Sequence, residues 1–188
     1  TLGVTLEIKG QKREADKSMR GLMKAFGLSV MLIYLILGTQ FKSFTQPLFV
    51  MVAIPFGIDG VLFGHIVMGH DITFLSMMGL VAASGIVVND SLVLVDLINR
   101  LRAEGVSTYE AAVKGSTQRL RPILMTSVTT VFGLAPLAFF ASGQARFLAP
   151  MAVSIVFGLF FATGLTLVVI PALYLIRDDM ERALRRLV

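Results

Sequence analysis

Cysteine is absent from this sequence and charged residues are scarce. The 188 residues include no Cys and two His, which excludes disulfide bonds and thiolate metal sites and argues against a histidine metal site. Asp, Glu, Lys and Arg make up 15% of the chain, against about 25% in a typical soluble domain. Also missing are a glycine-rich phosphate loop, a nucleophile elbow and a glycosidase-type carboxylate pair. We therefore expect neither an enzyme nor a protein that needs a cofactor.

Apolar residues dominate what is present. They make up 55% of the chain, and the mean hydropathy is +0.80. The charges gather between long apolar runs, which is typical of a polytopic membrane protein. The net charge of +5 comes from basic residues that flank the apolar runs and are not interleaved with aromatics. We therefore expect a lipid bilayer, and no nucleic acid, as the partner of this charge.

Five apolar segments are each long enough to cross a hydrocarbon core of about 30 Å. They lie at about 22–41, 44–67, 72–98, 122–141 and 147–176. The first and second, and the second and third, are joined by short loops, so these neighbours should pack antiparallel. The sequence predicts an all-α bundle of five transmembrane helices.

The two ends differ from this pattern. Residues 1–10 alternate apolar and polar, which predicts a strand whose sheet lies outside this chain. Residues 11–21 are charged and predict a helical lead-in to the first span. The chain opens with Thr and has no signal peptide, so we expect a C-terminal fragment in which 1–21 ends an extramembrane domain. Residues 177–188 form a basic tail.

The longest connection, 100–121, contains a helix-start signal. Ser107 and Glu110 have the S-x-x-E spacing of a capping box. This predicts a short amphipathic helix at about 108–114, bounded by Gly105 and Gly115, that lies along the membrane surface.

The basic residues predict the orientation of the bundle, because cytoplasmic loops carry an excess of Lys and Arg. With a cytoplasmic C-terminus, the only basic residue in the outer loops is Arg146. Basic residues of the N-terminal tail oppose this choice, but long translocated domains largely escape the rule. The inner side would then carry Lys42, Arg100, Arg102, Lys114, Arg119, Arg121, Arg177, Arg182, Arg185 and Arg186.

Two polar residues, Asn89 and Asp90, lie in the middle of the third apolar segment. An ionised Asp at the centre of a membrane helix costs about 2.5–3.5 kcal/mol and usually faces a helix bundle or a water-filled pathway. At 3.6 residues per turn, Asp90 shares a face with Gly79 and Ala83, and such small residues let another helix approach. The pair is therefore a candidate proton site, and the alternative is a buried polar pair that fixes helix register.

A second polar stripe opens the fourth segment. Arg119, Thr126 and Thr130 recur at helical spacing on one face, and with Asp90 they could form a proton relay. The alternatives are a snorkelling anchor for Arg119 and hydroxyls bonded to their own helix for both Thr residues. Asp59 in the second segment is a further candidate, which could instead face a cavity or a helix outside this chain.

Three stretches resemble one transporter family. GIVVNDSLVLVD at 85–96, RLRPILMTSVTTVFGLAPLA at 119–138 and FGLSVMLIYLILGTQFKSFTQPLFVMVAIPFG at 26–57 are similar to the last membrane helices of resistance–nodulation–division (RND) efflux permeases. The resemblance implies helices eight to twelve of twelve, with residues 1–10 ending the second periplasmic insertion. It implies a homotrimer in the bacterial inner membrane that exchanges protons for drugs or other amphiphiles, with a periplasmic adaptor and an outer-membrane channel.

The relay residues of that family match unevenly. Arg119 and Thr126 match its positions on the fourth segment. Where the best-known drug pumps have Lys followed by Asn, this chain has Asn89 and Asp90, and the family's paired Asp residues belong to a fourth helix outside this chain. We expect the membrane part of a proton-driven exporter; the alternatives are an RND relative that moves lipid, metal or protein, and a membrane scaffold without ion coupling.

Overall fold

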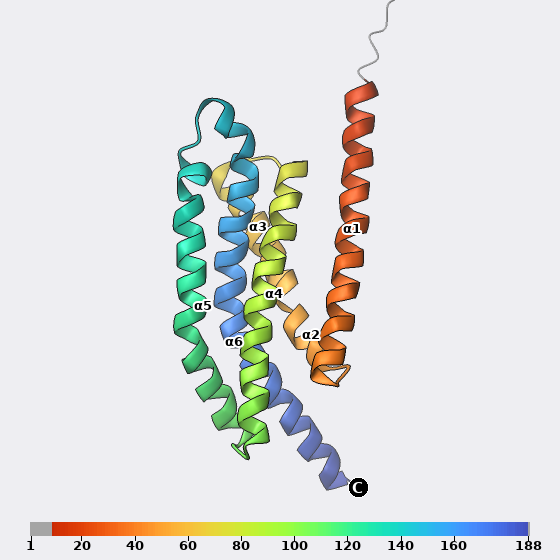
Figure 1. Ribbon diagram of the computed structural model, residues 1–188, viewed down its shortest axis with the longest axis vertical. Helices are drawn as coiled ribbons and strands as arrows, with labels where there is room; N and C mark the ends of the chain where they lie inside the picture. Colours follow the sequence, from red (N-terminus) through yellow and green to blue (C-terminus); the bar gives the residue numbers. More distant parts are fainter. Residues whose placement is uncertain (1–8, 188) are drawn as a thin grey trace, which may run out of the picture.

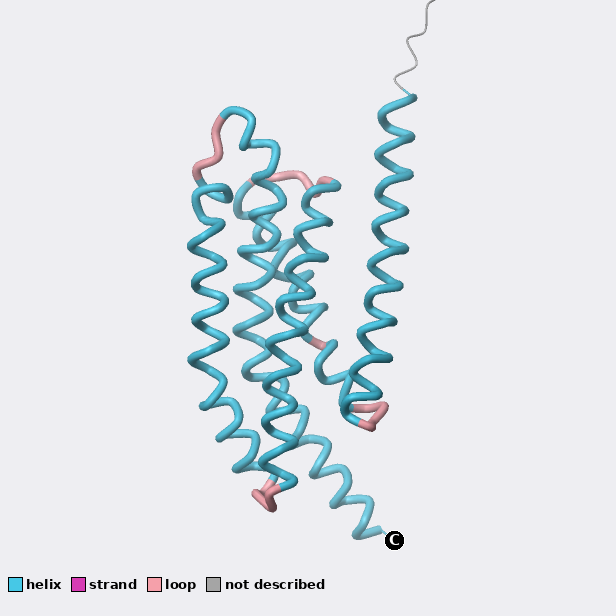
Figure 2. Tube along the Cα trace, viewed as in Figure 1, coloured by secondary structure: helices cyan, strands magenta, loops and turns pink. Residues whose placement is uncertain are grey.

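The computed structural model describes the backbone of residues 9–187 and the side chains of residues 13–180. Its helices are α1 (Lys9–Phe41), α2 (Gln46–Met51), α3 (Ala53–Met68), α4 (Phe74–Ala103), α5 (Thr108–Phe139) and α6 (Ala149–Leu187), with a 3₁₀ helix, η1 (Gly143–Leu148), before α6. Short loops join them (Figure 2). Five stretches are long and apolar enough to cross a membrane, and α2 and α3 together form one of them. The all-α polytopic prediction is confirmed.

The N-terminal strand prediction is wrong where the structure tests it. Residues 1–8 lie outside the described residues, and Lys9 and Gly10 already belong to α1. The charged lead-in of residues 11–21 continues into the first span as one helix of 33 residues. This continuity agrees with the sequence, because no Pro occurs between residues 9 and 41.

The second span is broken at Val52, between α2 and α3. Pro55 has no N–H to donate to the carbonyl of Met51, so the helical ladder loses a bond at this point. α3 ends at Gly69, whose φ of 65° is left-handed and suits glycine. α4 then begins at a capping box formed by Thr73 and Ser76.

The predicted surface helix at 108–114 is not a separate element. Ser107 caps a helix as expected, its hydroxyl accepting a hydrogen bond from the backbone N–H of Glu110 at 3.2 Å. That helix is α5, and it runs on through Pro122 to Phe139. Gly115 does not end it but packs against Ile98 of α4, leaving no room for a side chain. Pro122 therefore lies inside a long helix and does not begin one.

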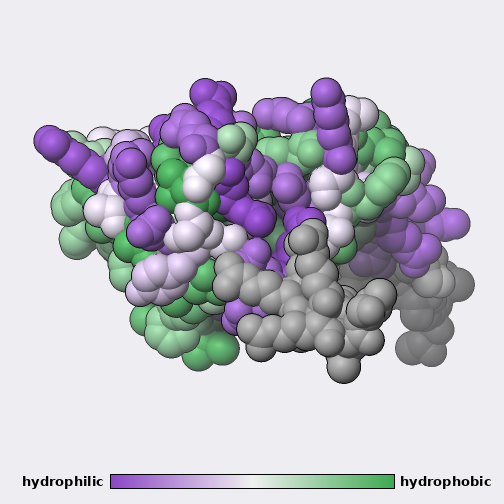
Figure 3. Space-filling model, turned by 90° about the horizontal axis from the view of Figure 1, so that it is seen from below, coloured by the Kyte–Doolittle hydropathy of each residue, from purple (hydrophilic) through white to green (hydrophobic). Residues whose placement is uncertain are grey.

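α6 is the helix against which α3, α4 and α5 all pack. In Figure 1 it lies among these three, whereas α1 stands apart and approaches the bundle at its lower end. Almost none of the apolar stretch of α1 is buried by the rest of the chain. Seen from the lower end, hydrophilic side chains cover much of the face and hydrophobic ones lie along its sides (Figure 3).

Glycines allow α3 and α4 to approach α6 closely. A Cβ atom at Gly60 would lie 2.5 Å from the carbonyl oxygen of Phe157, and one at Gly79 would lie 2.5 Å from that of Met151. Ala83, one turn after Gly79, is fully buried. The face that bears Gly79, Ala83 and Asp90 is predicted to be buried against protein. Gly79 and Ala83 confirm this, with α6 as their partner, whereas Asp90 is half-buried.

A buried histidine also joins α3 to α4. The Nε2 atom of His65 lies 2.7 Å from Oγ of Ser76, and its Nδ1 lies 2.9 Å from the carbonyl oxygen of Val61. Both side chains are buried. Because a buried polar group without a partner is costly, this pairing fixes the start of α4 against the end of α3.

We predict that Gly79→Ala destabilises the protein, because the added Cβ meets backbone rather than a flexible side chain. Overpacking of this kind typically costs about 1–3 kcal/mol. The matched control is Gly85→Ala on the same helix, where a Cβ meets nothing within 4 Å. The measurement is the midpoint of thermal unfolding of the detergent-solubilised protein. Equal midpoints for the two variants would contradict the close α4–α6 packing.

Candidate functional site

Asp90 and Thr126 are the two sequence candidates that the structure brings into contact. Asp90 lies mid-way along α4 and is half-buried, and Thr126 lies on α5. Their Oδ2 and Oγ1 atoms are 3.5 Å apart, at the long limit of a hydrogen bond from the hydroxyl to the carboxylate. The single hydroxyl hydrogen is shared with the carbonyl oxygen of Ile123, which lies closer, at 2.8 Å. Thr126 therefore has a secure local acceptor and a second, longer contact with the carboxylate.

Thr130 and Arg119 occupy the same face of α5, but neither forms a hydrogen bond or ion pair with Asp90 among the contacts of residues 13–180. Thr130 donates to the carbonyl oxygen of Thr126 at 2.8 Å, which is the back-bonded arrangement. Arg119 lies seven residues before Thr126, about 10.5 Å along the helix. Within residues 13–180, no ion pair joins it to Asp90, and its buried Nε has no hydrogen-bond partner. A relay that includes Arg119 would therefore need an intervening group.

The side chains of Asn89 and Asp59 are exposed. On α4, Ala82, Gly85 and Asn89 follow one another at helical spacing and are all exposed, so the described helices leave this face uncovered. Asp59 lies on the exposed side of α3 beside Ile58 and Leu62. Of the candidate pair Asn89 and Asp90, Asp90 therefore meets protein, because it contacts α5, whereas the described helices leave Asn89 exposed.

A second hydroxyl contact lies beside the first and was not anticipated. Ser127 Oγ on α5 and Thr163 Oγ1 on α6 are 2.9 Å apart, and both side chains are buried. They border an apolar cavity of about 300 Å³ whose other walls include Val128, Phe132 and Phe160. Ser127 directly follows Thr126 in the sequence, but its partner is 36 positions away, so no local pattern could reveal the pair.

A polar network also joins the lower halves of α2, α4 and α6. Asn99 and Gln46 exchange two side-chain hydrogen bonds, at 2.9 and 3.3 Å, and the hydroxyl of Tyr174 donates to Asn99 Oδ1 at 3.1 Å. Arg102 forms an ion pair with Asp178 at 3.5 Å. The three spans are therefore tied together by polar contacts far apart in sequence.

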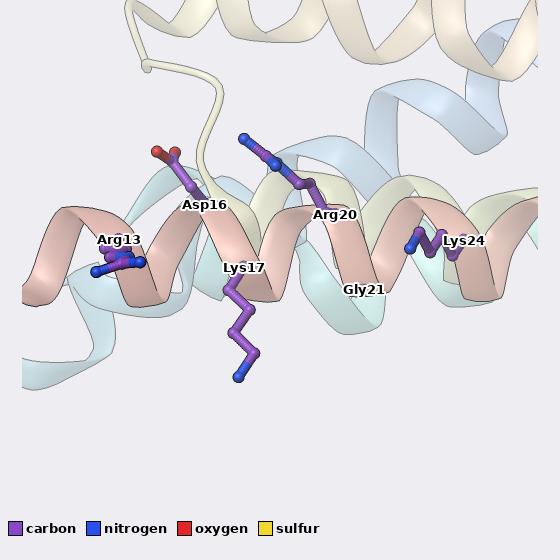
Figure 4. Close-up of a pocket in the computed structure, with 6 residues that line it drawn as sticks. All are labelled: Arg13, Asp16, Lys17, Arg20, Gly21 and Lys24. Atoms are coloured by element: carbon purple, nitrogen blue, oxygen red, sulfur yellow. The ribbon is translucent and has the colours of Figure 1, made fainter.

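The charged side chains at the start of α1 do not form a second candidate site. A surface hollow on α1 is lined by Arg13, Asp16, Lys17, Arg20 and Lys24, but Figure 4 shows Lys17 pointing away from Asp16 and Arg20. These side chains do not converge on one point. Among the described residues, no three His, Asp or Glu side chains form a group that could hold a metal ion.

A sequence profile decides the family. The profile of the AcrB/AcrD/AcrF family matches residues 1–178. The chain belongs to this family. Its relatives include the swarming motility protein SwrC of Bacillus subtilis, 33% identical over 172 residues that make up 91% of this chain and 16% of SwrC. Another is the cobalt-zinc-cadmium resistance protein CzcA of Cupriavidus metallidurans, 31% identical over 147 residues, 78% of this chain and 14% of CzcA.

A solved structure agrees with this assignment. The crystal structure of a heavy metal efflux pump superposes with a TM-score of 0.79 at 30% identity, over 90% of this chain and 17% of the pump. The sequence-based identification of an RND permease fragment is confirmed. This AcrB/AcrD/AcrF-family chain is a multi-pass membrane segment that spans about a sixth of the length of the relatives it matches.

We predict that Asn99→Leu destabilises this AcrB/AcrD/AcrF-family chain more than Tyr174→Phe does. Asn99→Leu leaves the half-buried Gln46 and the fully buried Tyr174 without their acceptor or donor, at about 1–3 kcal/mol per unsatisfied group. Tyr174→Phe removes one hydrogen bond, worth about 0.5–1.5 kcal/mol net. Thermal unfolding of the purified protein measures both. If Tyr174→Phe is the more harmful, the network is not centred on Asn99.

Proposed function

We propose that this chain is the C-terminal membrane portion of a proton-driven RND exporter and supplies part of its intramembrane proton relay. The observation that carries the proposal is the contact between Asp90 and Thr126 across α4 and α5. An ionised carboxylate in the middle of a membrane helix is costly in free energy, and such residues usually have a function. A protonatable group can drive transport if its charge state alters the relative stability of two arrangements of the bundle.

The residues have distinct roles in this proposal. Asp90 binds and releases the proton, and Thr126 stabilises its charged form by hydrogen bonding. Arg119, with its unpartnered buried Nε, lies further along α5 and supplies a positive charge beside the path. Thr130 extends the hydroxyl stripe in the other direction. Asn89, on the uncovered face of α4, faces the rest of the permease, and we assign no role to Asp59.

Family membership supports a proposal for the assembly and the membrane in which this chain works. We propose a homotrimer in a bacterial inner membrane, in which membrane helices one to seven and the periplasmic domains come from the remainder of the protein. A periplasmic adaptor and an outer-membrane channel complete the pump. The exported substrates are drugs or other amphiphiles, in keeping with a relative named as the multidrug/solvent efflux pump membrane transporter MepB of Pseudomonas putida, 28% identical over 174 residues.

We predict that Asp90→Asn reduces proton-driven export to background, because a permanently neutral side chain cannot bias two states by its protonation. Thr126→Ala should reduce export only about two- to tenfold, which corresponds to the net value of one hydrogen bond, about 0.5–1.5 kcal/mol. The assay is export of ethidium by proteoliposomes that contain the full-length permease, under an imposed pH gradient.

The control for this experiment is Asp96→Asn. Asp96 is a second carboxylate of α4, but it forms an ion pair at 2.9 Å with the exposed Arg100. Surface ion pairs of this kind contribute little to the free energy of unfolding. Normal expression and assembly of each variant must be verified first. Wild-type export by Asp90→Asn would overturn the proposal, because Asp90 would then be structural and the relay would be carried by the part of the permease outside this chain.

We also predict the orientation. Glu110 and Ser142 are both exposed, before and after the membrane-spanning part of α5. A cytoplasmic C-terminus places Glu110 inside and Ser142 outside. In a full-length protein without other cysteines, Ser142→Cys should react with a membrane-impermeant maleimide added to intact cells, and Glu110→Cys should react only after permeabilisation. The reverse pattern would show that the bundle is inverted.

A further inference from the structure

Ser127 and Thr163 depart from the way in which most helical hydroxyls of this chain are bonded. Ser84, Ser91 and Ser154 each donate to the carbonyl four residues earlier on their own helix, at 2.7–3.0 Å. Ser127 and Thr163 instead bond to each other across α5 and α6 at 2.9 Å. Their exposed fractions are 7% and 5%. In a membrane, such interhelical hydrogen bonds contribute to the association of helices.

Ser127 is adjacent to Thr126, so its hydrogen bond with Thr163 affects the direction in which Thr126 points. Consecutive residues of a helix differ by about 100° in direction and 1.5 Å in height. Thr126 therefore points to Asp90 on α4 while Ser127, at the same level, points to Thr163 on α6. α5 is held from two sides at the level of the proposed proton site.

The Thr126 contact is sensitive to rotation of α5. Its Oγ1 lies 3.5 Å from Asp90 Oδ2, at the long limit of a hydrogen bond. A side-chain atom about 5 Å from the helix axis moves about 0.9 Å when the helix turns by about 10°. A turn of that size in one direction breaks the contact, and in the other it shortens it.

We propose that Ser127 and Thr163 are positioning residues, which fix the rotation of α5 so that the Thr126 hydroxyl reaches the Asp90 carboxylate. The transport consequence depends on the proton-relay function proposed above. The geometric claim does not, because it concerns how Thr126 and Asp90 meet whatever the protein carries.

The test is the protonation of Asp90 measured directly. A hydrophobic carbodiimide modifies protonated carboxyls, so the rate of modification at Asp90, followed by mass spectrometry over a range of pH, gives a titration midpoint. The sample is the full-length permease in liposomes. Thr126→Ala must change this midpoint by removing a hydrogen-bond donor. Ser127→Ala and Thr163→Val should each shift it in the same direction as Thr126→Ala, by about 0.4 pH units for an average interhelical hydrogen bond.

Matched variants separate positioning from packing. Thr166→Val makes the same substitution one turn further along α6, at a buried hydroxyl that has no hydrogen-bond partner among the described residues. It should leave the midpoint unchanged. Ser84→Ala, at a buried back-bonded serine of α4, should do the same. Thr163→Ser, unlike Thr163→Val, keeps the hydroxyl and should have the wild-type midpoint.

The pairing itself is tested by the double variant. If Ser127 and Thr163 act through each other, Ser127→Ala with Thr163→Val shifts the midpoint no further than either change alone. Additive shifts, an unchanged midpoint in Ser127→Ala, or an equal shift in Thr166→Val would each overturn the proposal.

The outcome can be distinguished from failure of the proposed function. If Asp90→Asn exports ethidium normally while Ser127→Ala still shifts the midpoint, the relay function is wrong and the positioning role stands. If Asp90→Asn abolishes export and Ser127→Ala leaves both midpoint and export unchanged, the relay stands and the positioning role is wrong. If both proposals hold, Ser127→Ala should lower the export rate about threefold.

Discussion

In a hydrocarbon environment a polar side chain can form hydrogen bonds only with the protein, and this constraint governs the interior of the bundle. Most serine and threonine hydroxyls meet it locally, as Ser84 and Ser91 do by bonding to their own helix. A hydroxyl bonded to another helix therefore marks a place where two spans are held in register. Thr126 and Ser127 are adjacent residues that mark two such places.

Backbone packing gives α3, α4 and α6 a different kind of attachment. Gly60 and Gly64 on α3 and Gly79 on α4 lie so close to α6 that a Cβ at any of them would meet atoms of α6 at 2.5 Å. Protein interiors of this density repack in discrete steps rather than deform continuously. These three helices consequently form a closely fitted unit, and the buried His65–Ser76 contact adds a polar link between α3 and α4.

The sequence predicted the features that depend on local composition. Apolar length identified the five spans, and the spacing in RLRPILMTS placed Arg119 and Thr126 on one face. The depth of Asp90 in an apolar segment indicated that it would meet protein, and it contacts Thr126 of α5; the proton relay that the sequence suggested for the two residues stays a prediction. The prediction of a separate helix at 108–114 was wrong, because these residues begin α5. Gly115 was interpreted as a helix end, but it lies inside α5 and packs against Ile98.

Features that depend on distant pairs could not be predicted. Ser127 with Thr163, and Asn99 with Tyr174, are 36 and 75 positions apart. The members of each pair lie on different helices, so no helical period relates them. Asn89 shows the complementary limit: its neighbours Ala82 and Gly85 on α4 are small, as on a helix-packing face, yet the described helices leave all three exposed. The chain covers about a sixth of its relatives' length, and that a helix from the remainder covers Asn89 stays a prediction.

This arrangement makes α5 the span best placed to respond to the charge on Asp90. Thr126 is the described hydroxyl that reaches Asp90 from another helix, whereas the α3–α4–α6 unit is fixed by close contacts of glycines in α3 and α4 with α6. A change at the carboxylate therefore acts on α5 first, and α5 can pass it to α6 through Ser127 and Thr163 or yield by rotating. A buried hydroxyl pair favours the first outcome, because rotation would leave both hydroxyls without a partner, and an unsatisfied buried hydroxyl costs more than the net value of the bond itself.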